Sequence, residues 1–157
     1  MPNSTRATLE LTKAGIAFTV HHYTYDPCAD RIGMQAAAAL GEPARRVLKT
    51  LMAEVDGKAV CAIVPSDREI SMKKLAAAFG GKHAQMMKPA DAERLTGYHT
   101  GGISPFGQKK RVPVVIEETA LAEDAVFMNG GQRGLQVKLA PDDVVRVLTA
   151  TVAGAVA

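Results

Sequence analysis

The chain has 157 residues, of which 47% are hydrophobic and 22% charged, and its formal net charge at pH 7 is +3. This composition is typical of a folded globular protein and excludes a disordered chain, and the charge alone is too small to indicate a dedicated nucleic-acid binder. The polar N-terminus and the lack of any bilayer-length apolar run exclude a signal peptide and a membrane span, so we expect a cytoplasmic protein with no membrane contact.

Glycine, proline and other turn residues divide the chain into short segments with helical or strand periodicity. Helices are predicted over residues 4–14, 33–40, 72–79, 89–96 and 140–148. Strands are predicted over residues 16–23, 47–55, 58–64, 83–87, 112–116, 125–128 and 135–139. Asp56-Gly57 predicts a hairpin between the second and third of these strands. The residues after Thr149 are small and nonpolar, and we expect them to be loosely held.

The order of these elements mixes hairpins with short helices and lacks the regular strand–helix–strand alternation of a parallel sheet. No internal repeat, low-complexity tract or linker divides the chain. We therefore predict a single α+β domain over residues 1–157, built on a mixed sheet.

Residues 97–111 read G-Y-H-T-G-G-I-S-P-F-G-Q-K-K-R, with four glycines and one proline, which excludes a regular helix or a central strand. Gly101 and Gly102 let backbone N–H groups approach a ligand closely, and Pro105 biases Ser104 toward an extended conformation. A rigid, concave loop of this kind suits an anionic or carbonyl-bearing ligand. An ordinary surface loop with a solvated basic end has the same composition, so both interpretations stay open.

The remaining chemistry must come from isolated residues, because the chain has no nucleophile elbow, P-loop, H-E-x-x-H or dinucleotide fingerprint. Lys49 lies among apolar residues in R-R-V-L-K-T-L, where it either reaches along apolar surface to solvent or points to a ligand phosphate. We expect Cys61 in the core and Cys28 in a loop without an activating partner. Neither these thiols nor the scattered histidines have metal-ligand spacing, so we expect no metal and no cofactor.

The stretch T-G-Y-H-T-G-G-I-S-P-F-G-Q-K-K-R (96–111) together with Lys49 closely resembles the YbaK/EbsC-type Cys-tRNA(Pro) deacylases, relatives of the editing domain inserted in bacterial prolyl-tRNA synthetases. Further matches follow in the family's order: H-x-Y-x-x-D-P at 21–27, K-T-L at 49–51, K-K at 73–74 and G-G-x-R-G-L at 130–135. The resemblance implies a mostly antiparallel, curved sheet flanked by short helices, and a trans-editing enzyme that clears Cys-tRNA(Pro). In the family, the substrate's own thiol attacks the aminoacyl ester and leaves as a cyclic thiolactone, a lyase-like step without a protein nucleophile.

The resemblance also implies roles for individual residues. Backbone N–H groups around Gly101 and Gly102 are expected to bind the ester carbonyl, at roughly 3 kcal/mol for each good donor. Lys49 is expected to hold the phosphate or ribose of the terminal adenosine. The other expected substrate-binding residues are Tyr23, Thr50, Ile103, Ser104, Pro105, Asn129 and Gln136. Phosphate contacts with the tRNA acceptor stem are expected from Lys73, Lys74, Lys109, Lys110 and Arg111.

Two positions depart from the family pattern, since Asn129 stands where many members carry serine and Gln136 where some carry an acid. The amino acid removed, cysteine or alanine or another small one, therefore stays open, and alanine would need attack by water. A non-catalytic module that binds tRNA or the synthetase is a second interpretation, and an esterase or transferase acting on a small nucleotide-linked ester is a third. The expected partners are the acceptor end of tRNA(Pro) and prolyl-tRNA synthetase. The oligomeric state is not readable from the sequence.

Overall fold

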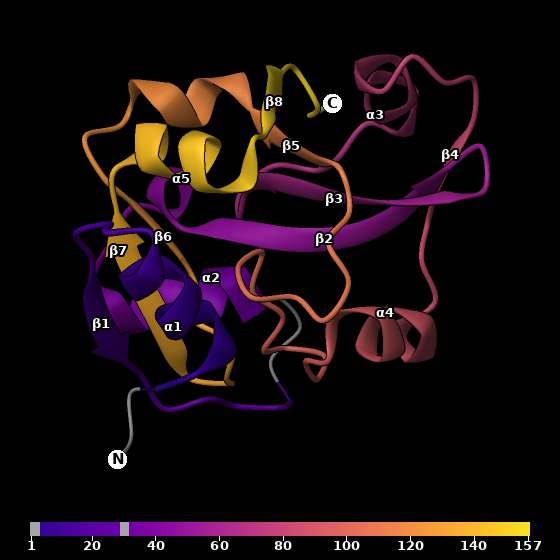
Figure 1. The fold of residues 1–157 in the computed structure, drawn as a ribbon. Helices are drawn as coiled ribbons and strands as arrows, with labels where there is room; N and C mark the ends of the chain where they lie inside the picture. The colour runs from indigo at the N-terminus through magenta and orange to yellow at the C-terminus, as the bar shows by residue number, and fades with distance from the viewer. Residues whose placement is uncertain (1–3, 29–31) are drawn as a thin grey trace.

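The computed structural model describes residues 4–28 and 32–157 (Figure 1). Its helices are α1 (Arg6–Lys13), α2 (Ile32–Leu40), α3 (Met72–Ala78), α4 (Pro89–Thr96) and α5 (Pro141–Leu148), with 3-10 turns at Ala44–Arg46 and Glu118–Ala122. Its strands are β1 (Thr19–His22), β2 (Leu48–Val55), β3 (Lys58–Pro65), β4 (Ala84–Met86), β5 (Val114–Glu117), β6 (Val126–Asn129), β7 (Leu135–Leu139) and β8 (Thr151–Ala153). No helix in the described segments is long and apolar enough to cross a membrane.

The strands form a three-stranded sheet in the order β1-β7-β6 and a five-stranded sheet in the order β4-β2-β3-β5-β8. Every pairing is antiparallel except those of β5 with β3 and with β8. The two sheets meet where Val47, just before β2, makes a parallel bridge with Phe127 of β6. The predicted α+β class is confirmed. The expected single sheet is divided in two, because from Ala53 onward β4 pairs with the edge of β2 that faces β6 at Val47.

Local sequence signals account for most element boundaries. Asp56 and Gly57 have φ angles of 49° and 80°, as a two-residue hairpin between β2 and β3 requires. Thr5 begins α1 with a capping box, since its hydroxyl accepts from the Thr8 N–H (3.1 Å) while the Thr8 hydroxyl accepts from the Thr5 N–H (2.8 Å). Ser71 caps α3, since its hydroxyl accepts from the Lys74 N–H (3.2 Å).

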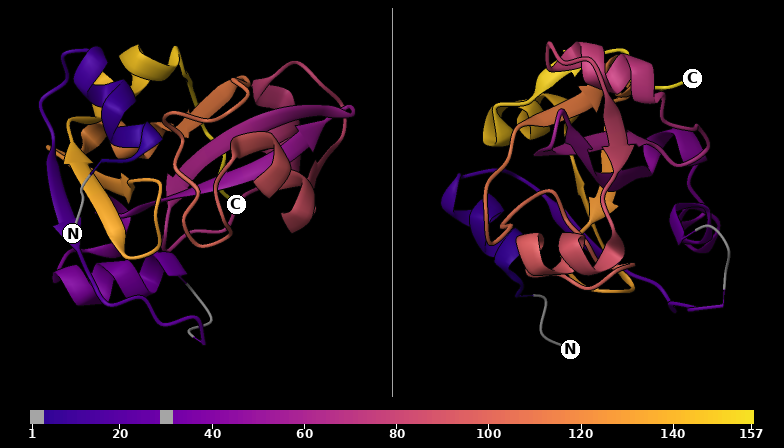
Figure 2. Two further views of the ribbon diagram at one scale, coloured as in Figure 1. Left: turned by 60° about the horizontal axis from the view of Figure 1, so that its bottom comes forward. Right: turned by 90° about the vertical axis from the view of Figure 1, so that its right-hand side faces the viewer.

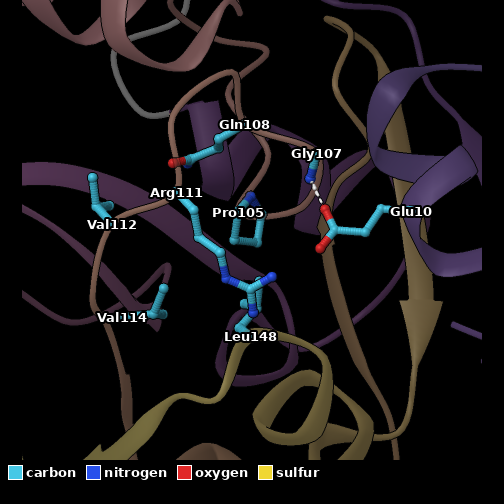
Figure 3. A pocket seen from close by; sticks show the side chains of 8 residues that line it. All are labelled: Glu10, Pro105, Gly107, Gln108, Arg111, Val112, Val114 and Leu148. Atoms are coloured by element: carbon cyan, nitrogen blue, oxygen red, sulfur yellow. Dashed lines mark hydrogen bonds between the residues drawn. The ribbon is translucent and has the colours of Figure 1, made fainter.

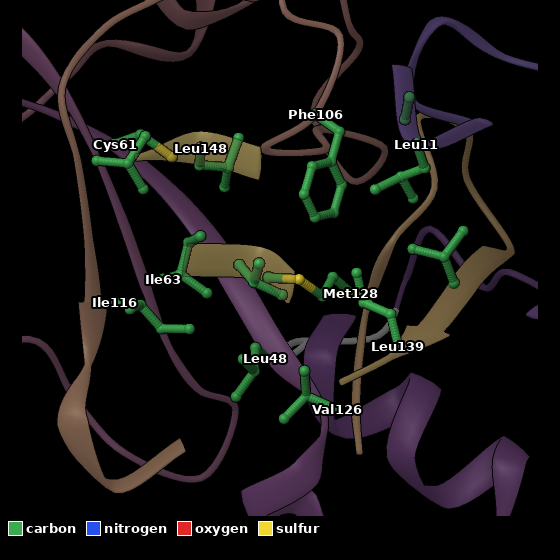
Figure 4. Close-up of a cluster of buried hydrophobic side chains, with 14 of the residues drawn as sticks. Leu11, Leu48, Cys61, Ile63, Phe106, Ile116, Val126, Met128, Leu139 and Leu148 are labelled. Atoms are coloured by element: carbon green, nitrogen blue, oxygen red, sulfur yellow. The ribbon is translucent and has the colours of Figure 1, made fainter. Parts of the chain in front are cut away.

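The main hydrophobic core lies between the two sheets and is closed by side chains from α1 and α5 (Figure 4). Leu48, Ile63 and Met128 are at most 3% exposed, and burying each such side chain stabilises the fold by about 1.5–3 kcal/mol. Cys61 is a core residue as predicted, and burial raises the pKa of its thiol to about 12. Phe106 comes from the glycine-rich stretch and is fully buried in this core, which anchors that stretch to the body of the protein.

The C-terminal residues are firmly attached, so the prediction of a loosely held tail is wrong. β8 extends the five-stranded sheet, and Ala155 and Val156 beyond it are buried. The buried Glu117 carboxylate accepts from the N–H groups of Ala155 (2.7 Å) and Val156 (3.2 Å), and Lys74 Nζ donates to the Val156 carbonyl (2.9 Å). The prediction relied on the small side chains of the tail, whereas its backbone groups make the attachment.

Candidate active site

The segment 97–111, which we call the glycine loop, follows α4 and is held in one conformation. The Tyr98 hydroxyl donates to the Phe106 carbonyl (2.6 Å), closing the loop across its width. The Thr100 N–H donates to the Glu93 carboxylate of α4 (2.7 Å). Since these bonds hold its ends and Phe106 fills the core, the glycine loop is an anchored loop and not a solvated connection.

The second half of the glycine loop faces the interior. Ser104 is fully buried, its hydroxyl accepts from the Phe106 N–H (3.2 Å), and its carbonyl accepts from Gln108 Nε2 (3.0 Å). Pro105 is buried and lines a separate cavity of about 210 Å³ beside Arg111 (Figure 3). Ser104 and Pro105 therefore shape the loop from within.

Helix α1 also fixes the glycine loop. Glu10 accepts a hydrogen bond from the Gly107 N–H (Figure 3). Gly107 has a φ angle of +66°, and a Cβ at this position would collide with the backbone of Arg6. Only glycine allows this close approach of the loop to α1.

Asn129, at the end of β6, joins the glycine loop to the turn between β6 and β7. Its Nδ2 donates to the Gly101 carbonyl (3.2 Å), and its Oδ1 accepts from the N–H groups of Gly131 (2.7 Å) and Gln132 (3.2 Å). The side chain is 8% exposed. Asn129 therefore positions the loop through both ends of its amide.

Three polar residues predicted to contact substrate lie side by side across neighbouring strands. The isolated Val47–Phe127 bridge is parallel, so Lys49 of β2 and Asn129 of β6, each two residues beyond it, extend from it in the same direction and on the same face. Asn129 in turn pairs with Gln136 of β7. Because residues in register on neighbouring strands share a face, Lys49, Asn129 and Gln136 form a polar row on one face of the strands.

Helix α2 covers the neighbouring part of this face. Its Ala36 and Ala37 pack with Phe127 in one cluster. Gln136 also pairs with His21 of β1, whose ring lies edge-on to Phe127 with 5.3 Å between the ring centroids. The polar row therefore adjoins an apolar patch that α2 covers. Lys49, in the polar row, is half-buried.

Three buried polar side-chain atoms have no hydrogen-bond partner among the described residues. Gln136 Oε1 belongs to the polar row, and Tyr23 Oη belongs to a residue packed with Phe127 beside it. Thr50 Oγ1 lies on the opposite face of β2 from Lys49, because successive residues of a strand alternate in direction. Burial raises the pKa of the Tyr23 phenol above its ordinary value. A buried polar atom without a partner costs about 1–3 kcal/mol, so such atoms are rare in folded proteins and indicate a place for water or a ligand. All three belong to residues that the sequence comparison with the family had assigned to substrate binding.

The structure narrows the choice of backbone donors. The Gly102 N–H donates to the His99 carbonyl (2.8 Å) within the glycine loop. In residues 4–28 and 32–157, the N–H groups of Gly101 and Ile103 have no acceptor. Donation to a ligand carbonyl is therefore open to Gly101 and Ile103, whereas Gly102 supports the turn between them.

The predicted tRNA-binding cations occupy two separate regions, because α3 and the glycine loop lie on different sides of β2 (Figure 1 and the right-hand view of Figure 2). Lys73 and Lys74 lie on α3, where Lys74 holds the C-terminal segment. Residues 109–111 line a groove of about 850 Å³ together with Lys58 and Arg94, which the sequence had not indicated. The turn after β2 and helix α4 bring these two cations to the groove, so no local motif marks them.

Arg111 is partly committed to the fold. Its Nη2 donates to the Val147 carbonyl at the end of α5 (2.8 Å), and its side chain extends over Leu148 (Figure 3). Lys109 and Lys110 are exposed and remain the mobile cations of this run.

Residues 29–147 match the family model described as the aminoacyl-tRNA editing domain. The chain is 37% identical over 125 residues to EbsC of Enterococcus faecalis, provisionally named a Cys-tRNA(Pro)/Cys-tRNA(Cys) deacylase, a match that covers 78% of this chain and 76% of EbsC. It is 26% identical over 139 residues to the multifunctional Ser/Thr-tRNA deacylase ProXp-y of Escherichia coli, covering 87% and 83% of the two chains.

The fold is shared with a crystal structure described as a candidate trans-editing enzyme for prolyl tRNA synthetase. The TM-score is 0.85 at 23% identity, and the superposition covers 100% of this chain and 98% of that one. Since the family model matches most of the sequence, the chain belongs to the aminoacyl-tRNA editing domain family.

Proposed function

We propose that this aminoacyl-tRNA deacylase acts in trans on Cys-tRNA(Pro), with residues 1–157 as one editing domain in the cytoplasm. Prolyl-tRNA synthetase misloads cysteine because a hydrophobic pocket discriminates poorly between amino acids of similar size. The observation that carries the proposal is the polar row of Lys49, Asn129 and Gln136, joined to Gly101 by the Asn129 amide. Within this row, Gln136 Oε1 is buried and has no hydrogen-bond partner among the described residues.

In the proposed reaction, the thiol sulfur of the esterified cysteine attacks its own carbonyl carbon. The C–O bond to the terminal ribose breaks, the ribose oxygen takes the thiol proton, and a cyclic thiolactone leaves. The N–H groups of Gly101 and Ile103 stabilise the developing oxyanion, each contributing roughly 3 kcal/mol if well aligned. Lys49 holds the phosphate or ribose of the terminal adenosine, and Tyr23 lines the pocket beside Phe127. Thr50, whose side chain lies on the other face of β2, helps to position Lys49 through the strand.

Gln136 supports a preference among amino acids. Its side chain is 4% exposed and its Oε1 lacks a donor, so it favours a substrate side chain that donates a hydrogen bond. The thiol of cysteine and the hydroxyl of serine or threonine meet this requirement, and the methyl of alanine does not. Seryl- or threonyl-tRNA is therefore the second candidate, which the similarity to ProXp-y also supports. Removal of alanine by water, or a non-catalytic binding role, is less well supported.

The tRNA acceptor stem is proposed to contact cations on the surface, at Lys73 and Lys74 and along residues 109–111. The Lys74 ammonium already bonds to the Val156 carbonyl, so its share is expected to be small. Because the net charge of the chain is only +3, we propose that prolyl-tRNA synthetase helps to deliver the substrate.

Deacylation of Cys-, Ser-, Ala- and Pro-tRNA(Pro) by the wild type and by Lys49→Ala tests the proposal. We expect loss of cysteine but not of alanine or proline, and a drop in kcat/KM of about 100-fold or more in Lys49→Ala. Removal of serine at a comparable rate would favour the second candidate over attack by the thiol. Lys82→Ala, an exposed lysine outside the site, serves as control and keeps wild-type rates. Mass spectrometry of the released cysteine product distinguishes thiolactone from the free amino acid.

Each outcome decides between the candidates. Rapid removal of alanine that depends on Lys49 would replace the thiol mechanism by attack of water. Deacylation that survives in Lys49→Ala would remove Lys49 from the site. No deacylation of any substrate by the folded wild type would leave a binding module and overturn the enzymatic proposal.

A further inference from the structure

A second group of side chains borders the candidate site, and the proposed reaction does not use it. The guanidinium carbon of Arg133 lies 5.4 Å from the centroid of the Tyr25 ring, in cation–π contact. Arg133 Nε also donates to the Thr100 carbonyl in the glycine loop (2.8 Å). The Tyr25 hydroxyl packs directly on Gly101, since a Cβ there would lie 2.6 Å from it.

These contacts hold an exposed arginine in a defined orientation. Arg133 belongs to the turn between β6 and β7, and a Cβ on Gly102 would lie 2.9 Å from its backbone nitrogen. The Tyr25 ring lies on one side of the guanidinium, and Arg133 is exposed. Among the described residues, no second ring and no ion pair engages this guanidinium. A flat cation is thereby presented next to the glycine loop.

An exposed imidazole and a carboxylate lie next to Arg133 and the glycine loop. The side chain of His99 is 86% exposed, and its Nδ1 lies 3.8 Å from the Glu93 carboxylate. That carboxylate, the acid beside the group, is already bound by the Thr100 N–H (2.7 Å). Arg133 is therefore the permanent cation of this surface, and the Glu93 carboxylate beside His99 is engaged within the fold.

We infer that Tyr25 and Arg133 form a stacking site for an unpaired base near the 3′ end of an RNA. Single-stranded RNA is recognised by stacking of its bases on aromatic rings and on arginine guanidinium planes. The inference rests on the proposed function, because the RNA is the one whose ester lies at the polar row. Asn129 binds the carbonyl of Gly101, on which Tyr25 packs, so a base stacked on Arg133 adjoins the reacting end of the same strand.

The test is a binding measurement that requires no turnover. The probe is an uncharged RNA hairpin with a single-stranded 3′-CCA end, carrying 2-aminopurine in turn at each unpaired position. In the wild type and in Tyr25→Phe, which keeps the ring, we expect quenched fluorescence at one position. Arg133→Lys keeps the charge but lacks the plane, and Tyr25→Ala lacks the ring, so each is expected to bind about tenfold more weakly and to lose the quenching.

The double variant Tyr25→Ala/Arg133→Lys is expected to bind little worse than either single variant, because one stack is lost in each case. Arg133→Lys that binds and quenches like the wild type, beside a weakened Arg133→Ala, would reduce Arg133 to a phosphate contact and overturn stacking. Unchanged binding in Tyr25→Ala, with normal deacylation, would overturn the inference while leaving the proposed function intact. Stacking that depends on Arg133 in a protein that deacylates nothing would overturn the proposed reaction alone.

Discussion

Two regions of the molecule bury polar side chains equally deeply and treat them in opposite ways. Glu117, at 2% exposure, accepts hydrogen bonds from the backbone N–H groups of Thr119, Ala155 and Val156. Gln136, at 4% exposure, has an Oε1 that receives no hydrogen bond within residues 4–28 and 32–157. A buried polar group whose hydrogen bonds are all formed stabilises the fold. A buried polar group that lacks a partner costs free energy, and such groups are typical of sites that bind a ligand. The completeness of hydrogen bonding, rather than the depth of burial, therefore distinguishes the C-terminal attachment from the candidate active site.

The Glu117 carboxylate also couples the C-terminal attachment to pH. Burial acts to raise its pKa, but the N–H donors of Ala155, Thr119 and Val156 outweigh burial and hold the pKa below its ordinary value. A carboxyl whose pKa is lowered in the folded state stabilises the protein above its unfolded pKa of about 4.3, and this contribution is lost as the pH falls through the folded value.

Glu117→Gln is expected to give the largest loss of stability, because an amide offers one acceptor oxygen and turns an NH₂ group toward N–H donors. The free energy of unfolding should fall by about 2–3 kcal/mol at pH 7. Urea denaturation from pH 7 to pH 3 measures this loss of unfolding free energy. Glu118→Gln, at an exposed position, serves as control. The difference from wild type should shrink below about pH 4, where the wild-type carboxyl becomes protonated. A difference that does not vary with pH would show that the charge of Glu117 is not what holds the tail.

Gln136→Leu is expected to do the reverse, lowering activity while sparing the fold. Removal of a buried atom without a partner should leave the free energy of unfolding unchanged or raise it by up to about 1 kcal/mol. Deacylation of Cys-tRNA(Pro) should fall by about tenfold, the value of one hydrogen bond to substrate. Thermal unfolding and single-turnover deacylation on the same preparation measure both effects, with Gln85→Leu on the surface as control. Lower stability at wild-type activity would make Gln136 a structural residue.

The smallest effect on stability is expected for Thr50→Val. The hydroxyl of Ser66, which has a partner, serves as the comparison. Thr50→Val removes an unpartnered hydroxyl and should change the free energy of unfolding by less than about 1 kcal/mol. Ser66→Ala removes a buried hydroxyl that donates to the Val47 carbonyl, and should cost about 1–2 kcal/mol. Denaturant unfolding of the pair compares them directly. An equal cost for both would contradict the distinction between satisfied and unsatisfied groups in this protein.

The sequence by itself determined the elements whose signals are local. The Asp56-Gly57 turn, the Thr5 and Ser71 caps and the α+β class follow from backbone preferences that act over a few residues. The glycine-rich character of 97–111 and the position of Lys49 on a strand are local signals of the same kind, and the candidate site is proposed from them.

Only the tertiary structure decided which distant groups meet. The Asn129 amide reaches Gly101, Arg133 lies over Tyr25, and the tail closes on Glu117. The family resemblance marked the segment that contains Arg133 without giving that residue a role, and nothing in the sequence marked Glu117. Hydrogen bonds and ring contacts between residues far apart leave no periodicity or spacing in the chain, because strand pairing and core packing, which depend on the whole fold, bring the partners together.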